Sequence, residues 1–132
     1  MAPKEEDGII FHLAPKALWE AAGEEYTPPT YEQDGFVHAT KNPALLLGIA
    51  NHFYKQAKGD YVLLHLEEKK MAHKVVYEAP MPVGETQPPE GADVVKFPHI
   101  YGPINKNGVV EETIVERAED GTFVKFGECV GF

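Results

Sequence analysis

The chain has 132 residues and a formal net charge of −9 at pH 7, from 21 acidic and 12 basic side chains. A chain of this length forms one domain and buries roughly two-thirds of its unfolded surface. The negative charge argues against non-specific binding to nucleic acid or to an anionic membrane, because both depend on cationic side chains. Cys129 is the single cysteine, which excludes an internal disulfide and a cysteine-based zinc site.

The sequence contains no pattern that predicts a membrane anchor or an export signal. No apolar run reaches the length of about 18 residues that a membrane-spanning helix needs. Residues 1–8 are polar and acidic, unlike a secretion signal or an Arg-rich transit peptide. We therefore expect a cytoplasmic protein with a flexible leader over residues 1–8 and a single domain over residues 9–132.

The first predicted strand runs from Ile9 to Leu13, an almost continuous apolar run in which His12 is the exception. Such a run indicates a strand that is covered on both faces. A short helix is predicted from Pro15 to Ala22, and Trp19 within it is expected to anchor the core.

Residues 24–34 are predicted to form a loop, because the pair Pro28-Pro29 can continue neither a helix nor a central strand. Loops held by proline beside a site often form one of its walls. Tyr26 and Tyr31 are therefore candidate wall residues, and the alternative is that their rings cap the core.

The stretch from Asp34 to Asn42 combines a turn signal, a short apolar run and a helix N-cap. This order places His38 in a short strand just before a helix predicted from Pro43 to Ala57. Backbone N–H groups at a helix start can hold an anionic or amide-bearing ligand. The alternative is a core histidine that donates to a carbonyl. The helix itself should bury Leu46, Ile49 and Phe53.

Further strands are predicted over residues 61–66, 75–78, 108–115 and 122–126, separated by turn signals. A charged, proline- and glycine-rich loop is predicted from Met81 to Asp93. The segment from Val94 to Ile104 should be extended and irregular because Pro98 and Pro103 flank its His99 and Tyr101. Two early helices and several scattered strands indicate an α+β domain rather than a doubly wound sheet.

Three histidines are the residues of this sequence that suggest a functional site. Glycine-rich phosphate loops, a Gly-x-Ser-x-Gly elbow and a His-Glu-x-x-His helix are all absent from the sequence. His12, His38 and His99 each lie in an apolar stretch, where a polar ring is costly unless it is paired. We therefore take these histidines as the candidate site.

Three separated motifs around these histidines resemble the domain-of-unknown-function family 952. They are Phe11-His12-Leu13-Ala14, Gly35-Phe36-Val37-His38-Ala39-Thr40, and the segment from Phe97 to Ile104. The resemblance covers about Ile9 to Ile114. The family in turn is similar to the ADP-ribosyltransferase superfamily, in the histidine-bearing branch that contains tRNA 2′-phosphotransferase. This similarity implies a single small α+β domain with a split, two-sheet β core and two early helices, in which a cleft between the sheets takes NAD.

The resemblance also implies roles for particular residues. It makes His12 the first-strand histidine that fixes the ribose and nicotinamide ends of NAD, and it places His38 along the same cleft. On this basis His12 and His38 are the expected catalytic residues. The expected substrate-binding residues are His99, Tyr101, Thr40 and Tyr31. NAD would be a substrate, with no tightly bound cofactor and no metal.

One feature of the superfamily has no clear counterpart in the chain. Many of its transferases use an acidic residue to hold a ribose hydroxyl and to stabilise an oxocarbenium-like centre. No acidic residue clearly fills that place, and Glu111 and Glu112 on a late strand are the possible substitutes.

Three functions remain open from the sequence. The first is an enzyme of the ADP-ribosyltransferase or glycohydrolase type that acts on NAD or an ADP-ribosyl compound. The second is a non-catalytic module that binds a small molecule or a protein. The third is a metal-assisted enzyme with His12, His38 and His99 as ligands, although no spacing signature supports it. Nucleic acid is not expected as a partner, because the chain lacks the positive charge that binds RNA.

Overall fold

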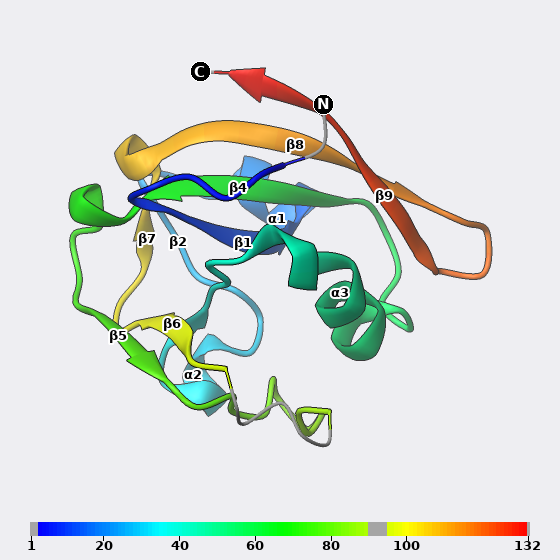
Figure 1. Cartoon of the computed structure of the whole chain (residues 1–132), viewed down its shortest axis with the longest axis horizontal. Helices are drawn as coiled ribbons and strands as arrows, with labels where there is room; N and C mark the ends of the chain where they lie inside the picture. The colour runs from blue at the N-terminus through cyan, green and yellow to red at the C-terminus, as the bar shows by residue number, and fades with distance from the viewer. Residues whose placement is uncertain (1–2, 90–94, 132) are drawn as a thin grey trace.

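A computed structural model of the protein describes residues 3–89 and 95–131. The largest sheet is antiparallel, with the strand order β1-β4-β8-β9 (Figure 1). Its strands are β1 (Ile9–Pro15), β4 (Tyr61–Glu67), β8 (Val109–Arg117) and β9 (Phe123–Gly131). Strand β1 is an edge strand, and its free side makes one isolated bridge between Phe11 and Thr40.

Two smaller antiparallel sheets complete the β structure. One has the order β3-β6-β5, and the other pairs β2 with β7. The strands are β2 (Glu25–Tyr26), β3 (Val37–His38), β5 (Val75–Glu78), β6 (Phe97–Ile100) and β7 (Ile104–Asn105). The expectation of a mixed α+β domain is confirmed, but the expected split pair of sheets is a set of three sheets. The segment expected to be irregular supplies β6 and β7, and the Pro98 carbonyl accepts from the Ala39 N–H at 3.0 Å.

The helices are short. They are α1 (Lys16–Ala21), α2 (Tyr31–Asp34) and α3 (Leu46–Tyr54), with 3-10 turns at Pro43–Leu45, Glu68–Lys70 and Lys106–Gly108. Among the described residues, none of the helices is long and apolar enough to cross a membrane. The loop predicted over residues 24–34 is wrong in part, because it contains β2 and α2.

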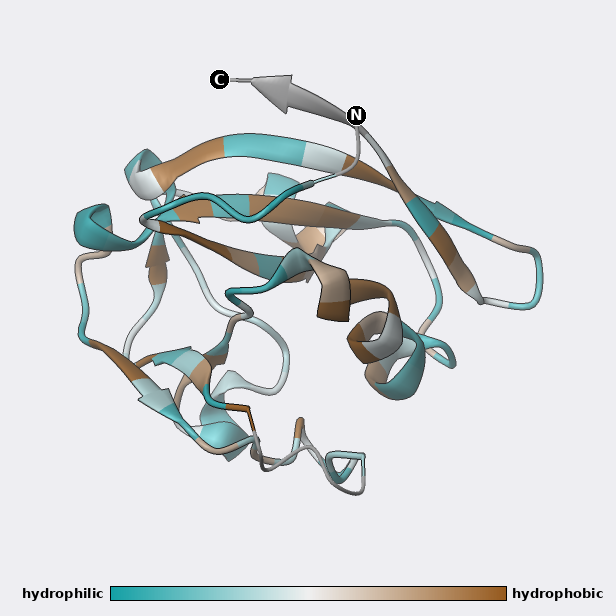
Figure 2. Cartoon of the chain, in the orientation of Figure 1, coloured by the Kyte–Doolittle hydropathy of each residue, from teal (hydrophilic) through white to brown (hydrophobic). Residues whose placement is uncertain are grey.

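Apolar side chains cover both faces of β1, as its almost continuous apolar run predicted, and they cover both faces of β4 as well. Ile10, Ala14 and Leu64 pack into a cluster with Trp19 and Tyr26. Phe11, Leu13 and Leu63 pack into a second cluster with residues of α3 and β9. Figure 2 shows the hydrophobic residues along β1, β4 and α3. Trp19 is buried, as expected of a core anchor, and its Nε1 donates to Glu112 Oε2 at 3.1 Å.

The predicted helix over residues 43–57 is present in a shorter form. It begins with a 3-10 turn, in which the Asn42 side chain accepts from the Ala44 N–H at 3.0 Å. Leu46 is buried as expected, whereas Ile49 and Phe53 are only half-buried. That part of the prediction was wrong because both side chains line a cavity rather than the core.

Arg117, the only arginine of the chain, fastens the end of α3 to the β8–β9 turn. Its guanidinium donates to the carbonyls of Tyr54, Lys55, Ala57, Gly59 and Gly121, the shortest bond being 2.6 Å to Gly59. The last carbonyls of a helix have no partner within the helix. Arg117 therefore closes the C-terminus of α3 with a side chain from the large sheet.

The predicted leader and the loop over residues 81–93 are described in part. The Glu6 carbonyl accepts from Lys41 Nζ at 2.6 Å and from the Ile9 N–H at 3.2 Å. The described part of the leader thus contacts the domain. Residues 1–2 of the predicted leader, residues 90–94 of the predicted loop and segment, and residue 132 lie outside the described residues.

Candidate functional site

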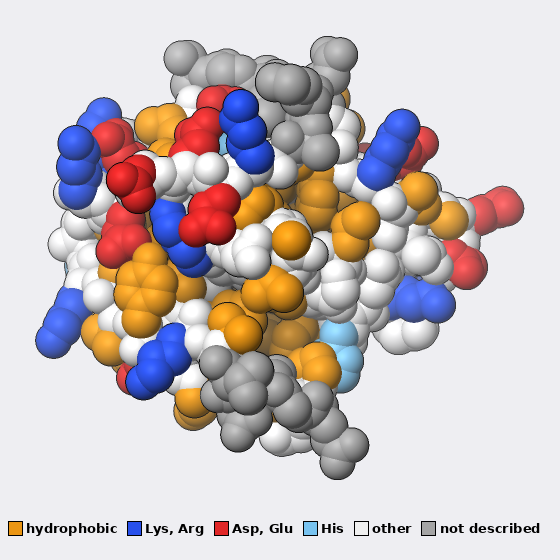
Figure 3. Space-filling view, viewed as in Figure 1, with side chains coloured by type: hydrophobic (Ala, Val, Ile, Leu, Met, Phe, Trp, Pro, Cys, Tyr) orange, Lys and Arg blue, Asp and Glu red, His pale blue; other side chains and the backbone are white. Residues whose placement is uncertain are grey.

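A cavity of about 350 Å³ lies between α3, the outer side of β1, strands β3 and β6, and the segment from Pro80 to Pro89. Its wall is mostly apolar and includes Leu46, Ile49, Phe53, Met81 and Val83. Figure 3 shows hydrophobic side chains gathered on this side of the molecule. Three histidines, His12, His38 and His99, also line the cavity. None of the lining residues that the structure describes is a lysine, an arginine, an aspartate or a glutamate.

His38 is held at both its ring and its backbone. The short helix α2 ends at Gly35, which has a positive φ of 83°, a conformation that glycine adopts without strain. The chain then turns into β3, so the His38 ring lies against the Asp34 side chain. His38 Nε2 donates to Asp34 Oδ2 at 2.9 Å, and the Asp34 side chain is only 5% exposed. The His38 carbonyl accepts from His12 Nδ1 at 2.6 Å.

His99 has a carboxylate partner of its own. It is 1% exposed, and its Nδ1 donates to Glu78 Oε1 at 2.8 Å. The same oxygen accepts from the Tyr101 hydroxyl at 2.5 Å. Phe36 stacks on the His99 ring, with centroids 4.2 Å apart and planes inclined by 22°. Glu78 and Phe36 thus fix the orientation of His99 from its edge and from its face.

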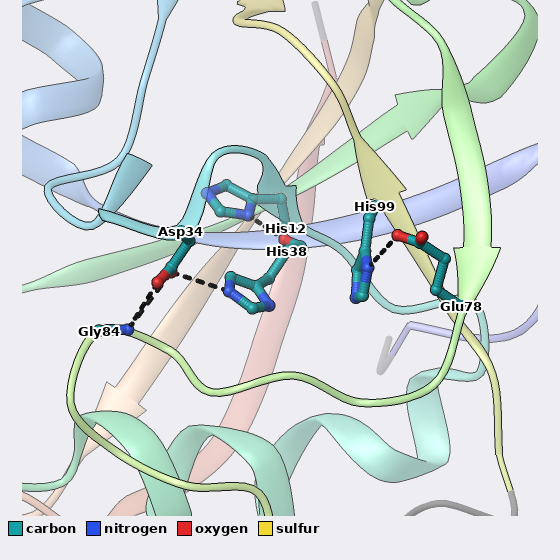
Figure 4. Close-up of polar contacts among 6 residues, drawn as sticks. All are labelled: His12, Asp34, His38, Glu78, Gly84 and His99. Carbon is teal, nitrogen blue, oxygen red and sulfur yellow. Dashed lines mark hydrogen bonds and ion pairs between the residues drawn. The ribbon is translucent and has the colours of Figure 1, made fainter. Parts of the chain in front are cut away.

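His12 differs from the other two histidines. It is 3% exposed, and its Nε2 is a buried atom without a hydrogen-bond partner among the described residues. Figure 4 shows its Nδ1 directed at the His38 carbonyl, with the other ring nitrogen on the far side from His38 and His99. Its ring lies beside that of Tyr26, with the two centroids 5.9 Å apart. His12 therefore orients the His38 backbone rather than meeting the other two rings.

Burial keeps two of these imidazoles neutral at pH 7. It lowers the pKa of His12 to about 4, an effect only partly opposed by the bond to the His38 carbonyl. Burial also lowers the pKa of His38, while the Asp34 carboxylate acts in the opposite direction. A carboxylate can only accept a hydrogen bond, so the proton of neutral His38 is on Nε2 and its Nδ1 carries the lone pair. Glu78 Oε1 likewise only accepts, so His99 carries an N–H at Nδ1.

The acidic residues that sequence reasoning did not find are Asp34 and Glu78. Asp34 was interpreted only as part of a turn, and its spacing of four residues from His38 was the available signal. Glu78 had no such signal, because β5 and β6 must pair before it reaches His99, 21 residues further on. The suggested substitutes lie elsewhere, since Glu111 and Glu112 are on β8 of the large sheet and do not line the cavity.

The remaining predicted site residues divide between the cavity and its surroundings. Thr40 lines the cavity, and its N–H and C=O both bond to Phe11 at 2.8 and 2.7 Å. Tyr101 is exposed beside Glu78 and is not a lining residue. Tyr31 is half-buried against the core, Tyr26 is buried in it, and neither is among the residues that line the cavity.

The arrangement gives no support to a metal centre. Within the described parts of the chain, no group of three or more histidine, cysteine, aspartate or glutamate side chains is placed to hold a metal ion. A metal site requires its ligand atoms to converge on one point. Instead, one nitrogen of each ring is directed at its own partner: the His38 carbonyl for His12, Asp34 for His38 and Glu78 for His99.

Comparison with known proteins places the chain in an uncharacterised group. The model of a family described as "Protein of unknown function (DUF952)" matches residues 13–112. Among solved structures, the chain is similar to protein CC0527 from Caulobacter crescentus, with a TM-score of 0.68 at 22% identity, over 88% of this chain and 93% of that one. A double mutant of CC0527 matches with the same TM-score at 23% identity, over the same shares of both chains. These likenesses show the fold alone. No curated protein gives a significant match.

Proposed function

The chain belongs to the DUF952 family, and because that membership names no activity, we propose from the site that its cavity binds the nicotinamide–ribose end of NAD or of a related ADP-ribosyl compound. We propose further that the protein cleaves the bond between the ribose and the base. The observation that carries the proposal is the pair of carboxylate-backed imidazoles, His38–Asp34 and His99–Glu78, on the wall of an otherwise apolar cavity.

The electrostatics of the cavity favour a cationic or uncharged group over a phosphate. The carboxylates of Asp34 and Glu78 bond to the rings of His38 and His99, which line the cavity. No lysine or arginine is among the described lining residues. An anion would therefore meet negative charge and find no cation to bind it. A pyridinium ring is cationic and aromatic, and it suits the faces of Phe53 and Phe97 on the wall. The phosphates of a dinucleotide would stay outside.

The size of the cavity and the order of the motifs support the same ligand class. A volume of about 350 Å³ is near the lower end of small-molecule sites, which suits one nucleoside rather than a whole dinucleotide. The resemblance of the sequence to the ADP-ribosyltransferase-like families matches His12 to their first motif and His38 to their second. The proposed ligand class therefore comes from the resemblance. The charge distribution of the cavity explains why the nicotinamide end, rather than the phosphates, would enter it.

A hydrolytic reaction at this site balances without a cofactor. The bond from ribose C1′ to the pyridinium nitrogen breaks, and its electron pair stays on nitrogen, so that neutral nicotinamide leaves. A water oxygen forms the new bond to C1′, and its proton passes to an imidazole lone pair, at His38 Nδ1 or His99 Nε2. A neutral imidazole can act as this general base. The nearby carboxylates favour the positive charge that develops on the ribose.

A second candidate function is ligand binding without catalysis. The observation that favours it is that Asp34 and Glu78 are each already bonded to a histidine. No carboxylate among the described residues lines the cavity, so no acid is free to hold a ribose hydroxyl. A protein of this kind would bind the same nucleoside and release it unchanged.

The test combines melting curves with product analysis. We expect NAD and nicotinamide riboside to raise the melting temperature, since a ligand that prefers the native state stabilises it. ADP-ribose, which lacks the pyridinium, should give a smaller shift. His99→Gln should lose the shift, whereas His73→Gln, outside the cavity, should keep it. The absence of any shift with NAD and nicotinamide riboside would refute the proposal. Release of nicotinamide from bound NAD separates the enzyme from the binding module.

A further inference from the structure

One buried carboxylate joins the His38 ring to the opposite wall of the cavity. Asp34 accepts from His38 Nε2 at 2.9 Å and from the Gly84 N–H at 3.1 Å to Oδ1 and 3.3 Å to Oδ2. Gly84 comes directly after Val83, which lines the cavity together with Pro80 and Met81. Figure 4 shows Asp34 between the ring and this segment. The histidine and the wall thus depend on the same side chain.

We infer that Asp34 is a positioning residue that sets both the tautomer of His38 and the path of the cavity wall at Gly84. The inference concerns the construction of the site and holds whatever ligand the cavity takes. It therefore does not rest on NAD as the substrate.

The tautomer follows from the chemistry of the carboxylate. Asp34 offers only acceptor atoms, so His38 must present an N–H at Nε2. The His12 bond to the His38 carbonyl holds the backbone of the same residue at 2.6 Å. With ring and backbone both fixed, Nδ1 is the nitrogen left with a lone pair. The Pro82 carbonyl also lies at this ring as an acceptor, so Asp34 acts on the tautomer through the 2.9 Å bond at Nε2.

The wall follows from the turn that carries Gly84. Val83 and Thr86 exchange two backbone hydrogen bonds of 2.9 and 3.0 Å, and this tight turn places Gly84 at a positive φ of 57°. A Cβ atom at Gly84 would also lie 3.1 Å from Thr30 Cγ2. The turn therefore lies directly against the start of α2, and the Gly84 N–H is directed at Asp34. Loss of the carboxylate would release this attachment.

Glu78 provides a matched comparison within the same site. It fixes the His99 ring in the same manner, but it is 37% exposed, and its second bond is to the Tyr101 side chain rather than to the cavity wall. Substitution of Glu78 should change the histidine it holds and leave the Gly84 turn unaffected. Substitution of Asp34 should change both the His38 ring and the turn.

The experiment is nitrogen-15 NMR of the imidazole rings together with amide hydrogen exchange. In the wild type at neutral pH, His38 should show the spectrum of an Nε2–H tautomer, and an Nδ1–H spectrum would overturn the inference without any variant. In Asp34→Asn, one amide oxygen must serve two donors, so the His38 spectrum should shift toward the Nδ1–H form. Exchange of the Gly84 amide should rise about tenfold or more through the weakened bond.

Glu78→Gln serves as the control. It should alter the spectrum of His99 while the Gly84 exchange rate stays at the wild-type value. The inference would be overturned if Asp34→Asn left both the His38 spectrum and the exchange rate of the Gly84 amide unchanged. Equal acceleration of Gly84 exchange in both variants would do so as well, because it would show a general loosening of the site.

Discussion

His38 and His99 are partners in the register of β3 and β6, and their rings meet edge to face with centroids 5.5 Å apart. A proton on one ring therefore disfavours a proton on the other, and His99 contributes to the lowered pKa of His38. The Phe36 ring packs against both imidazoles, with its centroid 4.7 Å from that of His38 and 4.2 Å from that of His99. The two imidazoles and Phe36 thus form one aromatic cluster at the centre of the site.

Acid should destabilise the protein through its buried histidines. The folded-state pKa of His12 is about 4, below the unfolded value of 6.5, so the unfolded state binds more protons between these two values. Stability is thus fully present above about pH 6.5 and is lost as the pH falls toward 4, by roughly 3 kcal/mol for complete burial. His38 shifts in the same direction. Urea unfolding at a series of pH values measures the slope.

A variant isolates the part of this slope that belongs to His12. His12→Asn keeps an N–H donor near the His38 carbonyl and removes the titrating ring. Its free energy of unfolding should fall less between about pH 6.5 and about pH 4.5 than that of the wild type. A His12→Asn slope equal to that of the wild type would assign the pH dependence to other groups.

Arg117→Lys should destabilise the protein by about 1–3 kcal/mol. A lysine ammonium cannot serve five carbonyls arranged around a planar guanidinium, and unpaired carbonyls at a helix end are costly. Thermal and urea unfolding measure the loss. Lys125→Gln removes an exposed partner of Glu116 and should leave the melting temperature almost unchanged. Similar effects of the two substitutions would show that Arg117 acts through charge alone.

Substitutions at two glycines should distinguish the cost of backbone strain from the cost of a steric collision. Gly59 and Gly121 have similar positive φ values of 95° and 96°. A Cβ at Gly59 meets open space, whereas one at Gly121 would collide with the Lys55 carbonyl. Gly59→Ala should therefore cost about 1–2 kcal/mol, and Gly121→Ala at least about 3 kcal/mol. Equal costs in urea unfolding would mean that the β8–β9 turn moves away from α3 without penalty.

Phe53→Ala should enlarge the cavity at a modest cost in stability. The ring is half-buried, so about 1–2 kcal/mol is expected from the apolar area lost. Leu46→Ala, at a fully buried position of the same helix, should cost about 2–5 kcal/mol. Urea unfolding compares the two variants. A larger loss for Phe53→Ala than for Leu46→Ala would show that the Phe53 ring belongs to the core.

The sequence predicted those features that depend on local pattern. The apolar run from Ile9 to Leu13 indicated a strand with both faces covered, and Trp19 indicated a core anchor. The position of His38 just before a helix, within a short strand, was also visible in the pattern. The catalytic and substrate-binding roles assigned to the histidines remain predictions.

Features that depend on strand register were not visible in the sequence. Glu78 reaches His99 only because β5 and β6 pair side by side, and no spacing rule links residues 21 positions apart. Asp34 reaches His38 through the left-handed turn at Gly35, which local propensity does not place against a particular ring. Ile49 and Phe53 have the periodicity of core residues, and periodicity cannot distinguish a core from the wall of a cavity.

The pairing of β1 with β4 has a consequence for the order of events during folding. Residues 9–15 pair with residues 61–67, and β3 pairs with β6, about as far away along the chain. Loops of this length must close before such pairs form, and proteins dominated by non-local pairs fold more slowly than helical ones. His12, His38 and His99 come together only after both closures. A refolding chain should therefore regain its helical signal before it regains the ability to bind a ligand.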